Sequence, residues 1–386
     1  MFRIGEEEIE AVARVIRSGK MFKVNDGLQE TSHCEEEIRE KFGAKETVLM
    51  TSGTAALTSA LIGLGIGPGD QVIVPAYTYI ATAMAVTAVG AIPVIAEVDE
   101  TLTLDPTDVE QKLTPHTKAI IPVHIQGFPC NMDALCAIAA RHGIAVLEDA
   151  CQAVGGSYHG KRLGTVGNAG ALSFNQFKVI SAGEGGALLT DDHDVYSRAM
   201  IYHDSGAIAF FGNQLENIHE ERFCGTEFRT NEITAAILRQ QLKRLDGILT
   251  DLRKNRDRII DGLRADLTFV PSNDIAGDCA TTLAFRFDSE EETLRFAEKC
   301  SLPLTVPINT GKHIYINWTA IMNKRGAYRA EMDPFKMEKN AGLVPDYRPD
   351  MCPKTLDLLK RTAYLYVSPD WSDEEIERII SACKQI

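Results

Sequence analysis

The sequence predicts an α/β protein in which a large, mostly parallel sheet domain is followed by a smaller C-terminal α+β domain. Between about residues 47 and 190, short apolar runs rich in Val, Ile and Ala alternate with segments of helical periodicity. Such runs are typical of strands buried on both faces. After residue 192 the alternation weakens, and the 386 residues exceed one ordinary domain. We therefore expect a large domain over 1–247 and a small one over 248–386.

The elements are predicted in chain order as follows. The acid-rich segment 1–20 lacks a long apolar core, so it predicts an amphipathic helix rather than a signal peptide. The segments AALTSALIGLG and MDALCAIAARHG have helical periodicity and end in glycine, as helices often do. The predicted strands are VLMTS (48–52), QVIVPA (71–76), IPVIAEVD (92–99), AIIPVHI (119–125), IAVLEDA (144–150), GALSF (170–174) and GGALLT (185–190).

The second half of the chain begins with a helical pattern over 230–263. It predicts one long helix, or two helices with a bend near Gly247. TTLAFRFD and LTVPIN are expected to form short strands, and the closing WSDEEIERIISACKQI a helix. This mixture favours a small α+β domain.

Composition excludes several classes of function. The net charge of −14, with no basic stripe, argues against a nucleic-acid partner. No apolar run reaches the roughly 18 residues that span a bilayer, so no membrane association is expected. The nine cysteines form no CxxC pair or Cys/His cluster, which predicts reduced thiols and neither a metal site nor a disulfide framework. A cytoplasmic protein is expected.

Several polar residues follow predicted strands, and ligands of open parallel sheets bind at the carboxyl ends of the strands. Thr51-Ser52-Gly53-Thr54 leads from a strand into a helix, where backbone N–H groups, hydroxyls and the helix dipole favour an anion such as phosphate. Ordinary N-capping by Ser52 or Thr54 is the alternative.

A carboxylate and an aromatic ring occupy two further strand ends. Asp149 closes IAVLEDA, with Gln152 three residues later, and it can hold a protonated ring nitrogen or cap a following helix. Tyr79, in PAYTYIATA, can stack on a flat ligand or serve in packing.

Lys178 lies in SFNQFKVISAGEGG (173–186), between apolar residues and a glycine-rich turn. A lysine in a partly dry site can act as a nucleophile or Schiff-base amine, whereas an ordinary lysine keeps its ammonium in water. Taken together, an anion cradle, a stacking ring, an acid and an amine in this order describe a site for pyridoxal 5′-phosphate.

At these residues the sequence resembles the DegT/DnrJ/EryC1/StrS family, whose members are mostly nucleotide-sugar aminotransferases of pyridoxal-phosphate fold type I, the aspartate-aminotransferase-like fold. The resemblance covers nearly the whole chain. Its most specific parts are TSGTAAL (51–57), GPGDQVIVPAYTYIATA (67–83), VHIQGFPCNMDAL (123–135), LEDACQAVGGSYHGKRLGTVG (147–167) and SFNQFKVISAGEGG (173–186).

The resemblance implies a role for each matched residue. Lys178 would form the Schiff base, and Asp149 would pair with the pyridine nitrogen. Gln152 would touch the ring hydroxyl, and Tyr79 would stack on the ring. The phosphate would be held by Gly53, Thr54 and Ser173.

The resemblance also implies a homodimer with shared active sites, because the family brings a segment of the neighbouring subunit to the phosphate. The matching segment here is GTEFRTNEITAA (225–236), which keeps Arg229 and Asn231 but has Glu227 where asparagine is common. The family's His and Tyr near the substrate are missing from ATTLAFRF (280–287). Substrate contacts are instead expected from His203, His313 or Tyr315, for each of which a surface or packing role is the alternative.

The implied function is transfer of an amino group from glutamate or glutamine to a keto-sugar, either nucleotide-linked or Kdo-like. Dehydratases of the family carry His at the lysine position, so Lys178 favours transamination. The alternatives are an aminotransferase for a non-sugar ketone such as a cyclitol, and a catalytically silent regulatory protein that binds the cofactor.

Overall fold

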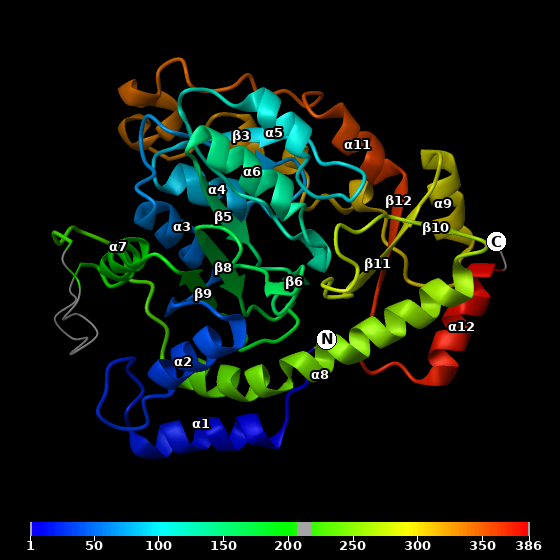
Figure 1. Cartoon of the computed structure of the whole chain (residues 1–386), viewed down its shortest axis with the longest axis horizontal. Coiled ribbons are helices and arrows are strands. Elements are labelled where there is room, and N and C mark those ends of the chain that lie inside the picture. The colour runs from blue at the N-terminus through cyan, green and yellow to red at the C-terminus, as the bar shows by residue number, and fades with distance from the viewer. Residues whose placement is uncertain (1, 207–217, 219, 385–386) are drawn as a thin grey trace.

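The computed structural model describes residues 2–206, 218 and 220–384, and its main feature is a seven-stranded sheet (Figure 1). The strand order is β1-β9-β8-β5-β4-β2-β3. All seven predicted runs contribute a strand, although β4 ends at Ile120, earlier than predicted. The strands are β1 (Glu46–Met50), β2 (Gln71–Pro75), β3 (Ile92–Ala96), β4 (Thr117–Ile120), β5 (Ala145–Asp149), β8 (Ala169–Ser173) and β9 (Gly186–Thr190).

Strand β9 runs against the direction of the other strands. It pairs antiparallel with both β1 and β8. The other neighbouring pairs are parallel, namely β8 with β5, β5 with β4, β4 with β2 and β2 with β3. The connection from β8 to β9, residues 174–185, contains no helix. A parallel neighbour needs a longer crossover, usually through a helix, so this connection returns the chain antiparallel.

Helices cover both faces of this sheet because successive strand residues point to opposite sides. Val72 and Val74 join one apolar cluster, while Ile73 joins the other. The first cluster includes residues of α3 (Gly53–Gly63), α4 (Ala81–Ala88) and α7 (His193–His203). The second includes residues of α2 (Glu30–Phe42), α5 (Pro106–Lys112), α6 (Met132–His142) and α8 (Glu232–Leu263).

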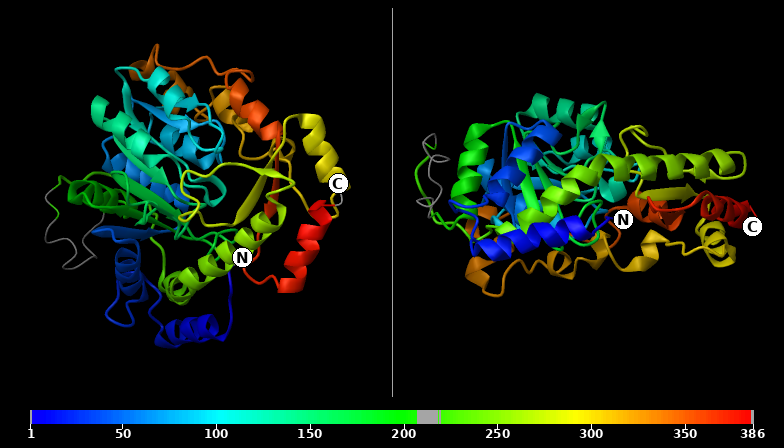
Figure 2. Two further views of the ribbon diagram at one scale, coloured as in Figure 1. Left: turned by 45° about the vertical axis from the view of Figure 1, so that its right-hand side comes forward. Right: turned by 90° about the horizontal axis from the view of Figure 1, so that it is seen from below.

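Helix α8 is one continuous helix through Gly247, the first of the two predicted alternatives. It contacts α1 (Glu6–Ser18) and α2 in its first half, and α12 (Asp373–Lys384) near its end (Figures 1 and 2). Ion pairs support both contacts, from Arg239 to Glu30 and from Arg258 to Glu377. The helix therefore extends from the large sheet to the C-terminal helix.

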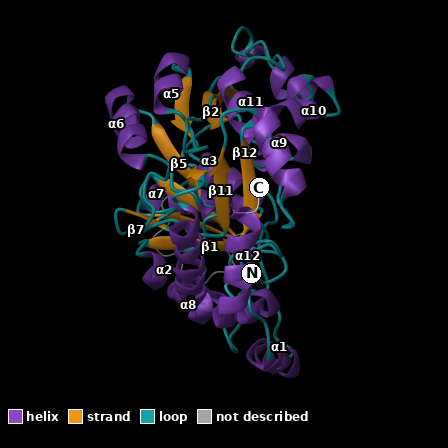
Figure 3. Ribbon diagram, turned by 90° about the vertical axis from the view of Figure 1, so that its right-hand side faces the viewer, coloured by secondary structure: helices purple, strands orange, loops and turns teal. Residues whose placement is uncertain are grey.

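The second sheet contains β10 (Thr268–Phe269), β11 (Thr282–Arg286) and β12 (Thr362–Tyr366), paired antiparallel (Figure 3). TTLAFRFD forms β11 as predicted. LTVPIN does not form a strand: Thr305 makes one isolated bridge to Tyr364, and Pro307, which has no N–H for a ladder, begins a 3₁₀ turn. Strand β12 was not predicted.

The remaining described elements are short. No helix in the described part of the chain combines the length and apolar character needed to cross a membrane. The remaining elements are β6 (Ser157–Tyr158), β7 (Lys161–Arg162), α9 (Glu290–Lys299), α10 (Thr319–Met322), α11 (Pro353–Lys360), η1 (Ile125–Gly127), η4 (Pro307–Thr310), η5 (Tyr315–Asn317), η6 (Ala330–Met332), η7 (Pro334–Lys336) and η8 (Glu338–Asn340).

Candidate active site

The candidate site lies at the carboxyl edge of the large sheet. Gly53 opens α3 just after β1, Asp149 ends β5, and Ser173 ends β8. An added Cβ on Gly53 would lie 2.6 Å from Sγ of Cys151 and 2.9 Å from Cβ of Ser173. The structure therefore brings these residues into one small region and leaves room only for glycine at position 53.

The first turn of α3 provides the predicted anion site. Ser52 is the N-cap residue, and its hydroxyl accepts a hydrogen bond from the Ala55 N–H at 3.1 Å. Other N–H groups in a first helical turn lack intrahelical partners, and the helix dipole there favours negative charge. Capping and anion binding are thus compatible, because Ser52 supplies the cap while Gly53 and Thr54 remain for an anion.

Asp149 is a buried carboxylate whose hydrogen bonds come from neutral donors. The Thr82 hydroxyl donates to Oδ2 at 2.8 Å, and the Cys151 N–H donates to Oδ1 at 3.2 Å. Turns rather than a helix follow Asp149, so the alternative of helix capping does not apply. A buried carboxylate with neutral donors favours a cationic partner, such as a protonated ring nitrogen.

Lys178 is half-buried on the connection between β8 and β9. Burial and the Asp149 carboxylate raise the pKa of the Cys151 thiol well above its ordinary value, and the charge of Lys178 opposes this rise. The surroundings of Lys178 are only partly as expected: Val179 and Ile180 are buried, but Phe177 is 83% exposed because it lies in the turn.

His313 joins the site from the C-terminal part of the chain. Its ring meets that of Tyr79 edge to face, with centroids 5.9 Å apart, and its backbone oxygen accepts from the Thr78 N–H at 2.7 Å. Burial, with the charges of Lys178 and Lys312, lowers the pKa of His313 to about 4. His313 is therefore a neutral imidazole at neutral pH, beside an aromatic ring and a lysine.

Tyr315 and His203, two other predicted substrate contacts, lie inside the protein. The Tyr315 hydroxyl donates to the Pro349 oxygen at 2.5 Å and accepts from the Cys352 N–H at 3.3 Å. His203 is fully buried at the end of α7, where burial and the charge of Lys23 lower its pKa well below the ordinary value. Packing, the other role that the sequence allowed, fits both residues.

Arg229 and Asn231 have partners within their own chain. The Arg229 guanidinium pairs with the carboxylates of Asp204 and Glu227, and Asn231 caps α8 by accepting from the Thr234 N–H at 3.0 Å. Burial lowers the pKa of Arg229. Their predicted contact with the cofactor of a neighbouring subunit stays a prediction.

Three contacts of the site were not predicted from the sequence. The Thr82 hydroxyl bonds Asp149, which is 67 positions away in the sequence. Cys151 lies against Gly53 through its Sγ and donates its N–H to Asp149. The Gln126 N–H donates to Oε1 of Gln152 at 3.1 Å. Each of these residues lies inside a segment that the resemblance matched, but nothing in its type or spacing indicates its contact.

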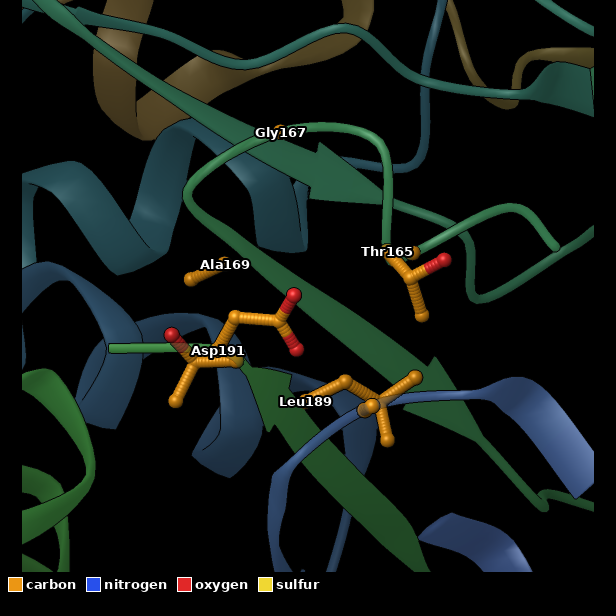
Figure 4. A pocket seen from close by; sticks show the side chains of 8 residues that line it. Thr165, Gly167, Ala169, Leu189 and Asp191 are labelled. Atoms are coloured by element: carbon orange, nitrogen blue, oxygen red, sulfur yellow. The ribbon is translucent and has the colours of Figure 1, made fainter. Parts of the chain in front are cut away.

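A small, shallow hollow lies at the other edge of the sheet (Figure 4). Ala169 begins β8 there, and Thr190 ends the antiparallel β9. This is the edge where parallel strands begin, whereas ligands of open α/β sheets bind where they end. The hollow is therefore separate from the candidate site. It is lined by Ala44, Gly164, Thr165, Gly167, Ala169, Leu189, Thr190 and Asp191.

The site residues fit the predicted cofactor. The start of α3 is so crowded that position 53 accepts only glycine. Without a side chain at this position, the N–H groups in the first turn of α3 stay accessible to a phosphate. Asp149 offers a buried negative charge to a pyridine nitrogen, and Lys178 offers an amine. A helix-flanked parallel sheet with these groups at its carboxyl edge defines a pyridoxal-phosphate-dependent aminotransferase of fold type I.

Comparison with known proteins gives the family. The chain belongs to the DegT/DnrJ/EryC1/StrS aminotransferase family, whose model matches residues 3–295. The spore coat polysaccharide biosynthesis protein SpsC of Bacillus subtilis is 31% identical over 408 aligned residues, covering 99% of this chain and 95% of that protein.

Two solved structures support the same assignment. An aminotransferase from Psychrobacter cryohalolentis is 28% identical with a TM-score of 0.80, covering 99% of this chain and 97% of that one. DesV of S. venezuelae, solved in complex with a ketimine intermediate, is 30% identical with a TM-score of 0.77, covering 98% and 94%. The predicted fold class and enzyme class are therefore confirmed.

Proposed function

We propose that this enzyme transfers the amino group of glutamate or glutamine to the ketone of a keto-sugar, nucleotide-linked or Kdo-like. Lys178 would be the amine that bonds to the aldehyde carbon of pyridoxal 5′-phosphate. The observation that carries this proposal is the buried Asp149 carboxylate, which accepts hydrogen bonds from neutral donors in a region shared with Lys178 and the start of α3.

Different residues of this chain would bind different parts of the cofactor. The first turn of α3, with Gly53 and Thr54, and the Ser173 hydroxyl hold the phosphate. Asp149 keeps the ring nitrogen protonated, because a nearby carboxylate raises the pKa of a cation. Gln152 would donate to the ring hydroxyl, and Tyr79 would stack on the ring.

When bound, the cofactor supplies an electron sink for the pair of electrons left when the substrate loses its α-proton. The free Lys178 amine removes that proton as general base and returns it at the end of each half-reaction. Proton transfer by a positioned side chain contributes about 10² to 10⁴ in rate. The neutral His313 lies beside Tyr79 without adding a second positive charge near Lys178.

The keto-sugar acceptor is supported by the relatives. SpsC is named for polysaccharide biosynthesis, and 31% identity over nearly the full length of both chains makes related chemistry the best hypothesis here. We also propose a cytoplasmic location.

The proposal includes a homodimer. Three large apolar side chains beside site residues are exposed: Tyr79 by 56%, Met84 by 46% and Phe177 by 83%. A second copy over this face would bury them and bring its segment 225–236 to the site. Sedimentation of the purified protein tests this part, and a monomer at micromolar concentration contradicts it.

The test of the function starts with the visible absorbance of the purified protein. Wild type should bind pyridoxal 5′-phosphate covalently and lose the visible band when glutamate or glutamine is added. Keto-sugars, with a ketocyclitol as the non-sugar comparison, should restore the band if they accept the amino group. Lys178→Ala should lose the band and at least about 10³-fold in turnover.

Each outcome separates the proposal from its alternatives. Near-normal transfer by Lys178→Ala contradicts the role of that amine. Restoration of the band by the ketocyclitol alone replaces the sugar by a non-sugar acceptor. A wild-type protein that binds the cofactor but reacts with no amino donor indicates the catalytically silent protein.

A further inference from the structure

Gln126 has an uncommon backbone conformation at the junction between the two sheets. It lies in η1, after β4, with φ 55° and ψ 16°. A residue with a side chain is uncommon in this left-handed region, and such residues gather at functional sites when their surroundings hold them there. The contacts of Gln126 show what holds it.

The backbone N–H, the backbone oxygen and the side-chain amide of Gln126 are all hydrogen-bonded, and the side chain also bonds Tyr77 and Tyr366. Its N–H donates to Oε1 of Gln152, on the cofactor side, at 3.1 Å. Its backbone oxygen accepts from the Thr281 hydroxyl at 2.6 Å, and its side-chain Oε1 accepts from the Thr282 hydroxyl at 3.0 Å. Thr282 begins β11, so Gln126 connects Gln152 with the second sheet.

The residues around this connection are tightly packed. A Cβ on Gly127, which has φ 90°, would lie 2.8 Å from Cβ of Cys279 and 3.0 Å from the Thr281 hydroxyl. The Cys279 N–H donates to the Gly127 oxygen at 3.2 Å, and the adjacent Ala280 also has a positive φ. Two left-handed turns thus contact each other, and neither can shift alone.

The hydrogen bond to Gln152 determines which way its side-chain amide faces. A backbone N–H can only donate, so the atom that it meets is the amide oxygen of Gln152. The NH₂ group of Gln152 is therefore the branch of the amide that points away from the Gln126 N–H, and it can donate to an acceptor there. A ring oxygen that carries negative charge is such an acceptor.

We propose that Gln126 is a positioning residue that fixes the donor orientation of Gln152 and ties it to the second sheet through Thr281 and Thr282. This inference rests on the proposed function, because it takes the ring oxygen of pyridoxal 5′-phosphate as the acceptor. Gln126 itself touches no substrate. It acts through the Gln152 amide and through the position of β11.

The variant Gln126→Gly tests this role. Glycine adopts a positive φ without strain, so the turn keeps its backbone while the side-chain bonds to Thr282, Tyr77 and Tyr366 are lost. The freed turn should orient Gln152 less well, and cofactor affinity should fall about fivefold, the effect of one hydrogen bond. The visible band should titrate at a higher pH, because an oxygen that loses a donor becomes more basic.

Three further variants act as controls. Thr282→Val removes the same hydrogen bond from the other side and should shift the titration in the same direction, by less. His159→Gly relaxes another left-handed residue (φ 48°), in the exposed turn between β6 and β7, and should leave the titration unchanged. In a Gln152→Ala background, Gln126→Gly should produce no further shift.

The outcomes also distinguish this inference from the proposed function. If wild type forms the lysine-bound band and Gln126→Gly titrates like wild type, the side chain of Gln126 and its tie to the second sheet do not help to orient Gln152, and the proposal fails. An equal shift with and without Gln152 contradicts the path through that amide. If wild type forms no band at all, the proposed function fails, and the melting temperatures of the cofactor-free variants then report only on folding.

Discussion

Two adjacent carboxylates at the end of β5, Glu148 and Asp149, lie on opposite faces of the sheet and differ in how their oxygens are used. Glu148 is fully buried and accepts from the N–H groups of Gly164, Val166 and Gly167 at 2.5 to 2.9 Å. It also lies 3.0 Å from Nε2 of His124. The donors that Asp149 meets among the described residues, which include the Thr82 hydroxyl and the Cys151 N–H, are neutral.

The difference separates a structural carboxylate from one available to a ligand. Four partners use the lone pairs of Glu148, so its charge holds the loop 164–167 against the sheet. Asp149 is also buried, but among the described residues it forms no ion pair, although the Lys178 charge acts in the same region. Burial therefore does not distinguish the two roles, whereas the number and charge of the hydrogen-bond donors do.

Asp149→Asn should have the largest effect. The neutral amide cannot hold a proton on the ring nitrogen, so turnover should fall about 10³-fold, which is about 4 kcal/mol in the barrier. The free energy of unfolding of the cofactor-free protein should change by less than about 1 kcal/mol, since both donors are neutral. Single-turnover kinetics and urea unfolding measure the two effects, and a large stability loss with normal turnover would reverse the assignment.

Glu148→Gln should show the opposite pattern. The amide has one acceptor oxygen for three backbone N–H groups, and its own NH₂ would face some of them. Unfolding free energy of the cofactor-free protein should therefore fall by about 3 kcal/mol. Turnover of the fully loaded enzyme should stay within about threefold of wild type below its melting temperature. Equal stability of Glu148→Gln and Asp149→Asn would contradict the comparison.

Much of the fold could be predicted from the sequence. Buried strands have continuous apolar runs whatever their neighbours, so all seven runs of the large sheet were found. The antiparallel direction of β9 was missed because pairing direction depends on the connection, not on the composition of the strand. LTVPIN lies beside the unpredicted β12, where Thr305 bridges Tyr364, but Pro307 has no N–H for a ladder, so this segment adds no strand to the sheet of β11 and β12.

The site was predicted as far as position along a strand allows. Gly53, Asp149 and Ser173 follow or end strands, and the topology brings such positions to one edge. Contacts between distant segments could not be predicted, such as Thr82 to Asp149 or His313 to Tyr79, because they depend on side-chain geometry. For the same reason, the sequence could not distinguish His313 from Tyr315 and His203 as a substrate contact. The structure buries Tyr315 and His203, whereas the His313 ring lies beside Tyr79.

Replacing His313 should have the smallest effect of the three substitutions, and it tests whether the positive charge of Lys178 acts on this ring. Burial, Lys178 and Lys312 lower its pKa from 6.5 to about 4 in the cofactor-free protein, where Tyr77 and Tyr79 are its other ring neighbours. Between these values the unfolded chain binds a proton more readily than the folded one. Stability from His313 is therefore fully present above about pH 6.5 and lost as the pH falls towards 4.

His313→Gln removes this contribution to the pH dependence. From pH 6.5 to pH 5, the variant should lose about 1 kcal/mol less unfolding free energy than wild type, after allowance for solvent screening. Urea unfolding at a series of pH values measures both slopes, and values at pH 8, where His313 is neutral in both states, give the constant offset between the proteins. Parallel curves over the whole range would mean that the ring is not held beside the Lys178 charge, and would remove His313 from the site.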